Sequence, residues 1–177
     1  MKTTLYLLAG FLLVISSCKK LAELTQFNLN YNTETTIQAG PASNLPFDVF
    51  TPEITTASES EYEGKKTSKN LIQSILIRKL VLKTDQSSGR NFDFLNSIKI
   101  YISANGKPEM LIAWKEGIPE TIGNELVLDC STEELKDFLV QDKYKLRLEV
   151  KTDKIVNQDV KIRIESLFRV DAKILGL

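Results

Sequence analysis

The amino-acid sequence predicts an all-β fold, an antiparallel β-sandwich of immunoglobulin-like type with seven to nine strands. Three observations support this prediction. Apolar and polar side chains alternate in many short segments, which is typical of strands with one buried face. Segments rich in Gly, Pro, Asn and Ser separate these strands at short intervals, as in sandwiches and barrels. A helical period occurs in one segment only, near residues 132–140. An open β-barrel is the alternative architecture.

The first part of this body contains one clear strand followed by polar connections. Residues 25–32, TQFNLNYN, alternate strictly between apolar and polar types, so we expect a half-buried strand there. Residues 34–39, ETTIQA, are a short second candidate. Residues 40–52 hold three prolines, which cannot donate to a β-ladder, and they predict a connection or an edge segment. Residues 53–66 are polar and predict an exposed loop or an irregular edge strand.

The middle of the chain predicts four more strands. Residues 71–84, LIQSILIRKLVLKT, are apolar on both sides, as in a central strand between two layers. A helix is the alternative for its first half, but the density of β-branched residues favours a strand. Residues 98–103 and 109–115 flank Asn105-Gly106, a dipeptide that favours a tight hairpin turn. Residues 124–130, NELVLDC, follow as a further strand.

The C-terminal part predicts a short helix and then the two most regular strands. Ser131 and Glu134 have the spacing of a capping box, and apolar residues then recur at helical spacing up to Leu139. Residues 145–153 and 160–175 alternate cleanly between apolar and charged types. The apolar face of the last strand consists of Val160, Ile162, Ile164, Ser166, Phe168, Val170, Ala172 and Ile174.

The N-terminus has the form of a cleaved export signal. Lys2 precedes an apolar run over residues 5–15. As a helix this run is about 16 Å long, too short for a bilayer core of about 30 Å, and it has the length of a signal-peptide apolar region. The four residues Ile15-Ser16-Ser17-Cys18 then resemble the lipobox of bacterial lipoproteins: a branched apolar residue, two small residues and a cysteine.

This resemblance implies lipidation of Cys18 and cleavage in front of it. The chain then divides into a signal peptide (1–17), a lipidated tether (18–24) and a single β-sandwich domain (25–177). The acyl chains would bind membrane lipid firmly. The whole is similar to the small β-sandwich lipoproteins of Bacteroidota, which implies the cell envelope and the outer rather than the inner membrane. Lys19 and Lys20, in place of an acidic export cluster, favour the periplasmic side.

The composition excludes several classes of function. The chain has no histidine, so Ser–His and Cys–His catalysis and histidine-ligated zinc or iron sites are excluded. Its 23 basic and 23 acidic residues give no positive excess for binding nucleic acid. Cys130 has no partner in a chain whose other cysteine is lipidated, and we expect it to be a small buried hydrophobe. We expect no enzymatic activity and no cofactor.

Two groups of side chains are candidate binding residues. Glu59, Glu61 and Glu63 lie at period two and, in an extended segment, would all point the same way, as calcium ligands do. No EF-hand loop accompanies them, and a solvated loop is the favoured interpretation, so we predict no metal site. Trp114 lies at a strand end beside a proline-containing loop, and Tyr101 on the neighbouring strand of the hairpin is expected to share its face.

Three functional hypotheses follow. The first is a non-enzymatic interaction or structural module that binds an envelope protein, for which we expect an exposed apolar patch or an open strand edge. The second is a protein that binds a glycan or another small ligand through Trp114 and Tyr101. The third is a hydrolase that works through carboxylates alone, which needs two facing acids in a cleft.

Overall fold

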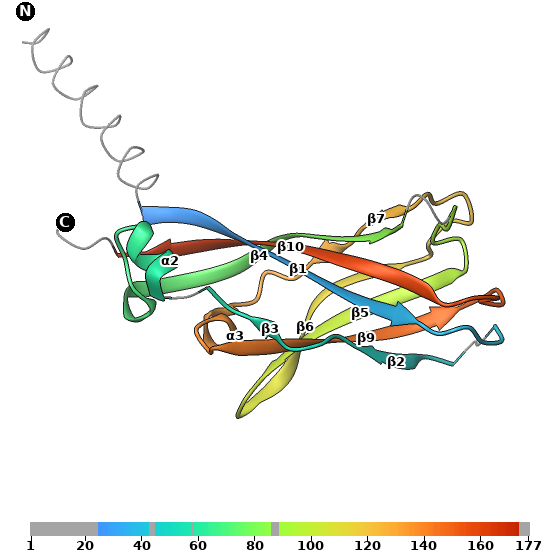
Figure 1. Cartoon of the computed structure of the whole chain (residues 1–177), viewed down its shortest axis with the longest axis horizontal. Coiled ribbons are helices and arrows are strands. Elements are labelled where there is room, and N and C mark those ends of the chain that lie inside the picture. Colours follow the sequence, from blue (N-terminus) through green and yellow to red (C-terminus); the bar gives the residue numbers. More distant parts are fainter. Residues whose placement is uncertain (1–24, 43–44, 58, 86–88, 174–177) are drawn as a thin grey trace, which may run out of the picture.

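A computed structural model describes residues 25–42, 45–57, 59–85 and 89–173. In these residues two antiparallel sheets pack face to face, which confirms the predicted all-β sandwich (Figure 1). The lipobox, the signal peptide and the tether lie outside the described residues. No helix among the described residues is long and apolar enough to cross a membrane.

The first sheet has four strands, and its longest members lie side by side along their whole length. Every residue from Gln26 to Ile37 pairs with the last strand of the chain. The predicted strand at 25–32 and the separate candidate at 34–39 are therefore one continuous strand. The order is β1 (Gln26–Ile37), β10 (Val160–Ala172), β4 (Ile72–Thr84) and β7 (Glu125–Val127).

The second sheet has six strands and is bounded by very short ones. Gly106, with a φ of +69°, closes the hairpin between its two central strands, as the Asn-Gly signal predicts. The order is β2 (Phe47–Phe50), β9 (Lys143–Thr152), β5 (Leu95–Ala104), β6 (Lys107–Glu116) and β8 (Asp129–Cys130), with β3 (Ile54–Thr55) paired to the start of β9.

The core lies between the two sheets and follows the alternation of the sequence. All predicted inward residues of β10 from Val160 to Ala172 are buried, and Ile174 lies outside the described residues. Ile98, Ile100 and Ile102 of β5 face them, fully buried. Period two in the sequence therefore gives one buried and one wet face on each of these strands.

The predicted strand at 124–130 is divided between the two sheets. Its first half is β7, which pairs with β4, and its second half is β8, which pairs with β6. Leu128, between them, is buried and donates its N–H to the Leu80 carbonyl at 3.0 Å. The chain thus changes sheets at Leu128 and closes one side of the sandwich.

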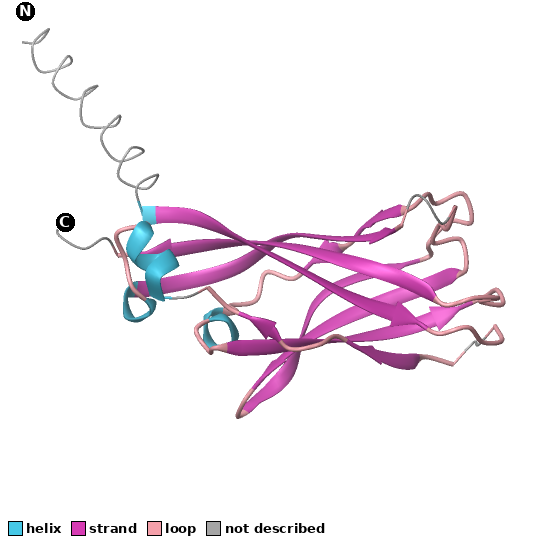
Figure 2. Ribbon diagram, in the orientation of Figure 1, coloured by secondary structure: helices cyan, strands magenta, loops and turns pink. Residues whose placement is uncertain are grey.

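The helices differ from the sequence prediction, and Figure 2 shows them gathered at one end of the sandwich. Residues predicted as a polar loop or edge strand form helix α2 (Glu59–Gly64), because its Tyr62 is fully buried against the core and packs edge-on against Phe27. A 3-10 turn, η1 (Lys69–Leu71), precedes β4. The helix predicted near 132–140 is confined to α3 (Lys136–Leu139).

The predicted capping box is not formed. The N-cap residue of α3 is Leu135, and the Ser131 hydroxyl oxygen is buried without a hydrogen-bond partner among the described residues. Glu134 reaches instead to β4, where its Oε1 accepts a hydrogen bond from the Ile75 N–H at 2.8 Å, and it also accepts one from the Lys136 N–H. A long-range contact to the sheet has replaced the local one.

Candidate functional site

Tyr101 and Trp114 lie on the outer face of the six-stranded sheet. Tyr101 pairs with Arg147 of β9, and Trp114 pairs with Lys99 of β5, two positions along from Tyr101. Paired residues point to the same side of a sheet, and the residues on the other side of these strands are the buried isoleucines of β5. Both rings are half-buried. The structure thus brings the two predicted residues to one face.

An arginine covers the ring of Tyr101. The Arg147 Cζ atom lies 4.1 Å from the centre of that ring. Its guanidinium binds Glu109 through two hydrogen bonds of 2.9 and 2.6 Å and Asp48 through one of 2.6 Å. These carboxylates hold the pKa of Arg147 above its ordinary value, with Glu109 contributing most. The ring face that a sugar would stack on is therefore occupied by a clamped guanidinium.

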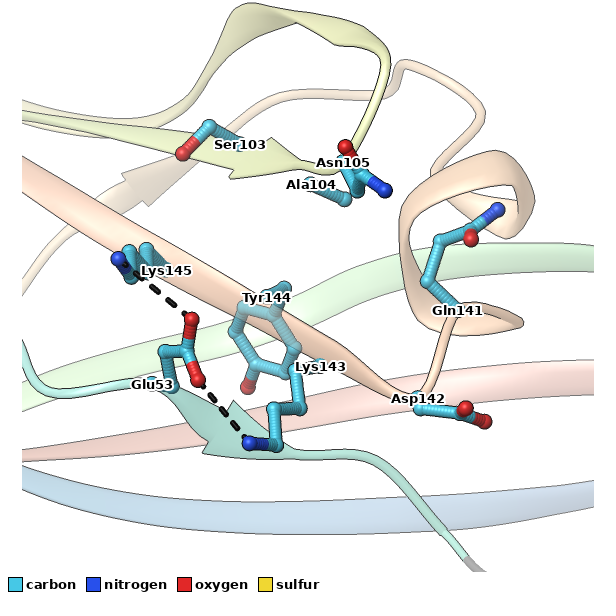
Figure 3. Close-up of a pocket in the computed structure, with 9 residues that line it drawn as sticks. All are labelled: Glu53, Ser103, Ala104, Asn105, Gln141, Asp142, Lys143, Tyr144 and Lys145. Atoms are coloured by element: carbon cyan, nitrogen blue, oxygen red, sulfur yellow. Dashed lines mark hydrogen bonds and ion pairs between the residues drawn. The ribbon is translucent and has the colours of Figure 1, made fainter.

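A polar hollow of about 690 Å³ lies at the end of this face (Figure 3). Glu53 sits on one side of it and binds Lys143 and Lys145 at 3.1 and 3.6 Å. Asn105 from the hairpin turn and Gln141 from the loop after α3 lie across from this cluster. Glu53 is neutralised by these two lysines, and Asp142, the other acid of the lining, pairs with Lys69 at 3.0 Å and points away from Glu53. The two carboxylates of the hollow therefore do not face each other as hydrolysis by an acid pair requires.

The three glutamates considered as weak candidates for calcium ligands do not all share a direction. They lie on helix α2, where Glu59 and Glu63, four residues apart, share one face and Glu61 lies on the opposite side. No cluster of three or more acidic, cysteine or histidine residues suited to a metal occurs within the described ranges. The extended geometry expected for this segment is wrong because burial of Tyr62 favours a helix.

Cys130 is half-buried on β8, and its thiol is free. Burial raises the pKa of this thiol above its ordinary value, and the neighbouring Asp129 raises it further. A thiol of this kind is protonated at neutral pH and is a poor nucleophile.

The outer edge of the four-stranded sheet is open along β1. This strand is 12 residues long and pairs only with β10 among the described strands. It holds one charged side chain, Glu34, and no proline, glycine or lysine. Phe50, 62% exposed, lies beside it, and its carbonyl accepts a hydrogen bond from the Thr35 hydroxyl. Sheet edges of this length are usually blunted by charge, proline or bulges.

Sequence reasoning missed two of these features. Arg147 looks like one of many solvated charges on β9, and only the pairing of β9 with β5 places it over Tyr101. The alternation of β1 predicts a strand but not its position at an edge, because strand order depends on distant partners.

Comparisons with known proteins give only distant likenesses. No family model and no curated protein matches this chain. Among solved structures, the xylan-binding module CBM15 is similar with a TM-score of 0.41 and 11% identity, over 84% of this chain and 99% of that one. The acid-stable capsid of Helicobacter pylori bacteriophage KHP30 has a TM-score of 0.37 and 9% identity, over 81% and 92% of the two chains. Likenesses this weak carry no argument about function.

Proposed function

We propose that this chain is a non-enzymatic interaction module, anchored by lipid on Cys18 in a bacterial cell envelope, that binds a partner protein through the edge of β1. The observation that carries the proposal is the open 12-residue edge described above. The N-terminal Ile15-Ser16-Ser17-Cys18 motif supports the anchor, and the outer membrane, on its periplasmic side, is the proposed location.

The edge of β1 suits strand addition. An extended segment that pairs with such an edge gains a row of backbone hydrogen bonds, and alternate side chains give specificity. On β1, Phe27, Leu29 and Tyr31 are partly buried and pack against the core, so an added strand would extend the core rather than meet a wet surface. A mean strand has five to six residues, so this edge offers roughly twice the usual length.

The proposed anchor keeps this edge near the membrane. Seven residues lie between Cys18 and Gln26, the first residue of β1, so the two are eight residue steps apart. A fully extended chain of this length spans at most about 29 Å. The edge would therefore meet partners that lie at or in the same membrane.

The anchor is tested by substituting Cys18. Wild-type chain expressed in its bacterial host should incorporate labelled palmitate and fractionate with membranes. Cys18→Ser should incorporate none and should be recovered unlipidated. Equal labelling of both forms, or no labelling of the wild type, would contradict lipidation at this residue.

The edge is tested by a photo-crosslinking amino acid placed at Asn32, which is exposed on β1. Gln73, exposed on β4 of the same sheet, is the matched control position. Crosslinks to protein should form from position 32 and be lost when Asn30→Lys places a charge on the edge. Crosslinks that form equally from both positions, or persist with Asn30→Lys, would count against the edge.

A glycan or small-ligand binding protein is the second candidate, because Tyr101 and Trp114 are half-exposed on one face. Trp114 is the single tryptophan of the chain, so its fluorescence reports directly on this face. Titration with envelope polysaccharides should shift that fluorescence, and Arg147→Ala, which uncovers the Tyr101 ring, should strengthen binding. Unchanged fluorescence in both wild type and Arg147→Ala, with both proteins folded, would remove this candidate.

A further inference from the structure

We propose that the strand added to β1 is β1 of a second copy of this chain, antiparallel and related by a twofold axis at Asn30. This inference rests on the proposed function, since it names the partner that the open edge accepts. It makes one eight-stranded sheet from two four-stranded sheets.

The side chains of β1 are complementary to themselves in this register. Asn30 faces Asn30 of the other copy, and Asn28 and Asn32 face each other. Directly opposed side chains in an antiparallel pair lie about 4.5–5.5 Å apart, within reach for amide-to-amide hydrogen bonds. All three exposed asparagines of the strand are thereby paired.

The charges of the sheet agree with the same register. Glu34 faces the uncharged Gln26 of the other copy, so the one charged side chain of β1 never meets its own kind. Asn32 of one copy faces Asn28 of the other across the axis. On the neighbouring β10 strands, Asn32 pairs with Glu165 and Asn28 pairs with Arg169, so the charges on the two sides of this asparagine pair are opposite. Like charges directly opposite each other destabilise a strand pair, and this register has none between the two β1 strands.

The buried side of the strand also continues across the axis. Leu29 of one copy faces Tyr31 of the other. Both are partly buried and pack against their own cores. A shift by one residue would place these side chains opposite the asparagines, because the side-chain period of a strand is two. The two faces therefore exclude registers shifted by an odd number of residues.

The other three sheet edges suit this pairing poorly. β7 and β8 have three and two residues. β2 has four residues and lies between Pro46 and Pro52, which cannot donate to a ladder. The long edge is thus the one whose length and composition allow a symmetric interface.

Both proposed tethers are compatible with one membrane. In this register Gln26 of one copy lies opposite Glu34 of the other, so the two Gln26 residues are about 27 Å apart along the strands. The tethers leave from opposite ends of the paired segment. They reach the same bilayer when the paired strands lie parallel to it.

Exchange of charges at the axis tests this proposal on the full chain. Two differently tagged copies are expressed together, extracted in detergent and purified through one tag. Wild-type copies should co-purify. Asn30→Lys paired with itself, and Asn30→Glu paired with itself, should lose about tenfold or more of the second copy, because like charges then meet at the axis. Asn30→Lys with Asn30→Glu should restore it.

A second set of variants tests the register. A copy with both Asn28→Lys and Asn32→Lys should not retain itself, whereas Asn28→Lys should retain Asn32→Glu. Gln73→Lys, on β4 of the same sheet, should retain itself as the wild type does. Circular dichroism of each variant should show the wild-type β spectrum.

Two results would overturn the dimer: wild-type copies that do not co-purify, or Asn30→Lys copies that still do. If wild-type copies fail to co-purify while position 32 crosslinks a different protein, the dimer is wrong and the proposed function stands. If position 32 also crosslinks nothing, both proposals fail.

Discussion

The two edges of the four-stranded sheet are treated in opposite ways. On the β4 side the chain covers its own backbone: β7 pairs with residues 81–83, Leu128 donates to the Leu80 carbonyl, and the Glu134–Leu135 segment satisfies both backbone groups of Ile75. On the β1 side, no described strand other than β10 pairs with the edge. One edge is closed by three separate contacts, and the other is left long and nearly uncharged.

A single side chain closes part of the covered edge. The Glu134 carboxylate takes the place of a strand at the Ile75 N–H. Burial alone would raise the pKa of its carboxyl, but hydrogen bonds from the Ile75 N–H, the Ser74 side chain and the Lys136 N–H hold that pKa below its ordinary value. No side chain among the described contacts of β1 accepts from its edge in this way, and this is the edge where we propose that a second copy binds.

The largest effect on stability is expected in β10, the strand that lies between β1 and β4. Phe168 of β10 is fully buried and packs edge-on against Tyr31, with ring centres 5.8 Å apart. Phe168→Ala leaves a cavity between the sheets and should lower the free energy of unfolding by about 3–5 kcal/mol. Urea denaturation followed by circular dichroism measures this. Phe168→Leu should cost clearly less, and equal losses for the two variants would argue against a packed site.

A smaller effect is expected at the closed edge. Glu134→Ala leaves the Ile75 N–H without its acceptor and should lower the free energy of unfolding by about 1–2 kcal/mol, at the low end for a charged bond because Glu134 is itself exposed. Glu134→Gln keeps a neutral acceptor and should lose less. Glu133→Ala, an exposed neighbour, is the control and should change little. If Glu133→Ala matches Glu134→Ala, the edge contact has no special role.

The same carboxylate predicts a dependence on pH. Its folded pKa is below its unfolded value of about 4.3, so its stabilising contribution is present above that pH and is lost as the pH falls through the folded pKa. Unfolding free energies measured from pH 7 to pH 3 should therefore fall more steeply for wild type than for Glu134→Gln. Glu34, Glu53, Glu109 and Asp137 also have lowered pKa values, and they contribute equally to both proteins. Parallel curves would show that Glu134 does not take part.

The sequence predicts the features of this fold that neighbouring residues determine, and it misses those that depend on contacts with residues far away in the chain. The face of β10 and the turn at Gly106 are decided by neighbouring residues, and both are predicted correctly. Helix α2 is not, because Tyr62 is drawn into the end of the core by contacts such as Phe27, far away in the sequence. The same holds for Leu128, whose change of sheet is invisible in an unbroken run of strand-like residues.

The candidate sites repeat this pattern. Tyr101 and Trp114 are found from their residue types and the hairpin that joins their strands. Glu134 shows how a local motif can give a wrong prediction, since the spacing from Ser131 predicts a helix cap and the side chain binds β4 instead. Strand order, which makes β1 an edge, has no local signal at all.

The smallest effect on stability is expected at the open edge. Asn30 is exposed on β1, so Asn30→Lys should change the unfolding free energy of a single copy by less than about 0.5 kcal/mol. Association through the open edge would stabilise the folded state by mass action, so the melting temperature of wild type should rise with protein concentration. That of Asn30→Lys should not, and Gln73→Lys should follow wild type. Melting curves over a hundredfold range of concentration test this. If the β1 edge binds no second copy, the melting temperatures of wild type, Asn30→Lys and Gln73→Lys should all be independent of concentration.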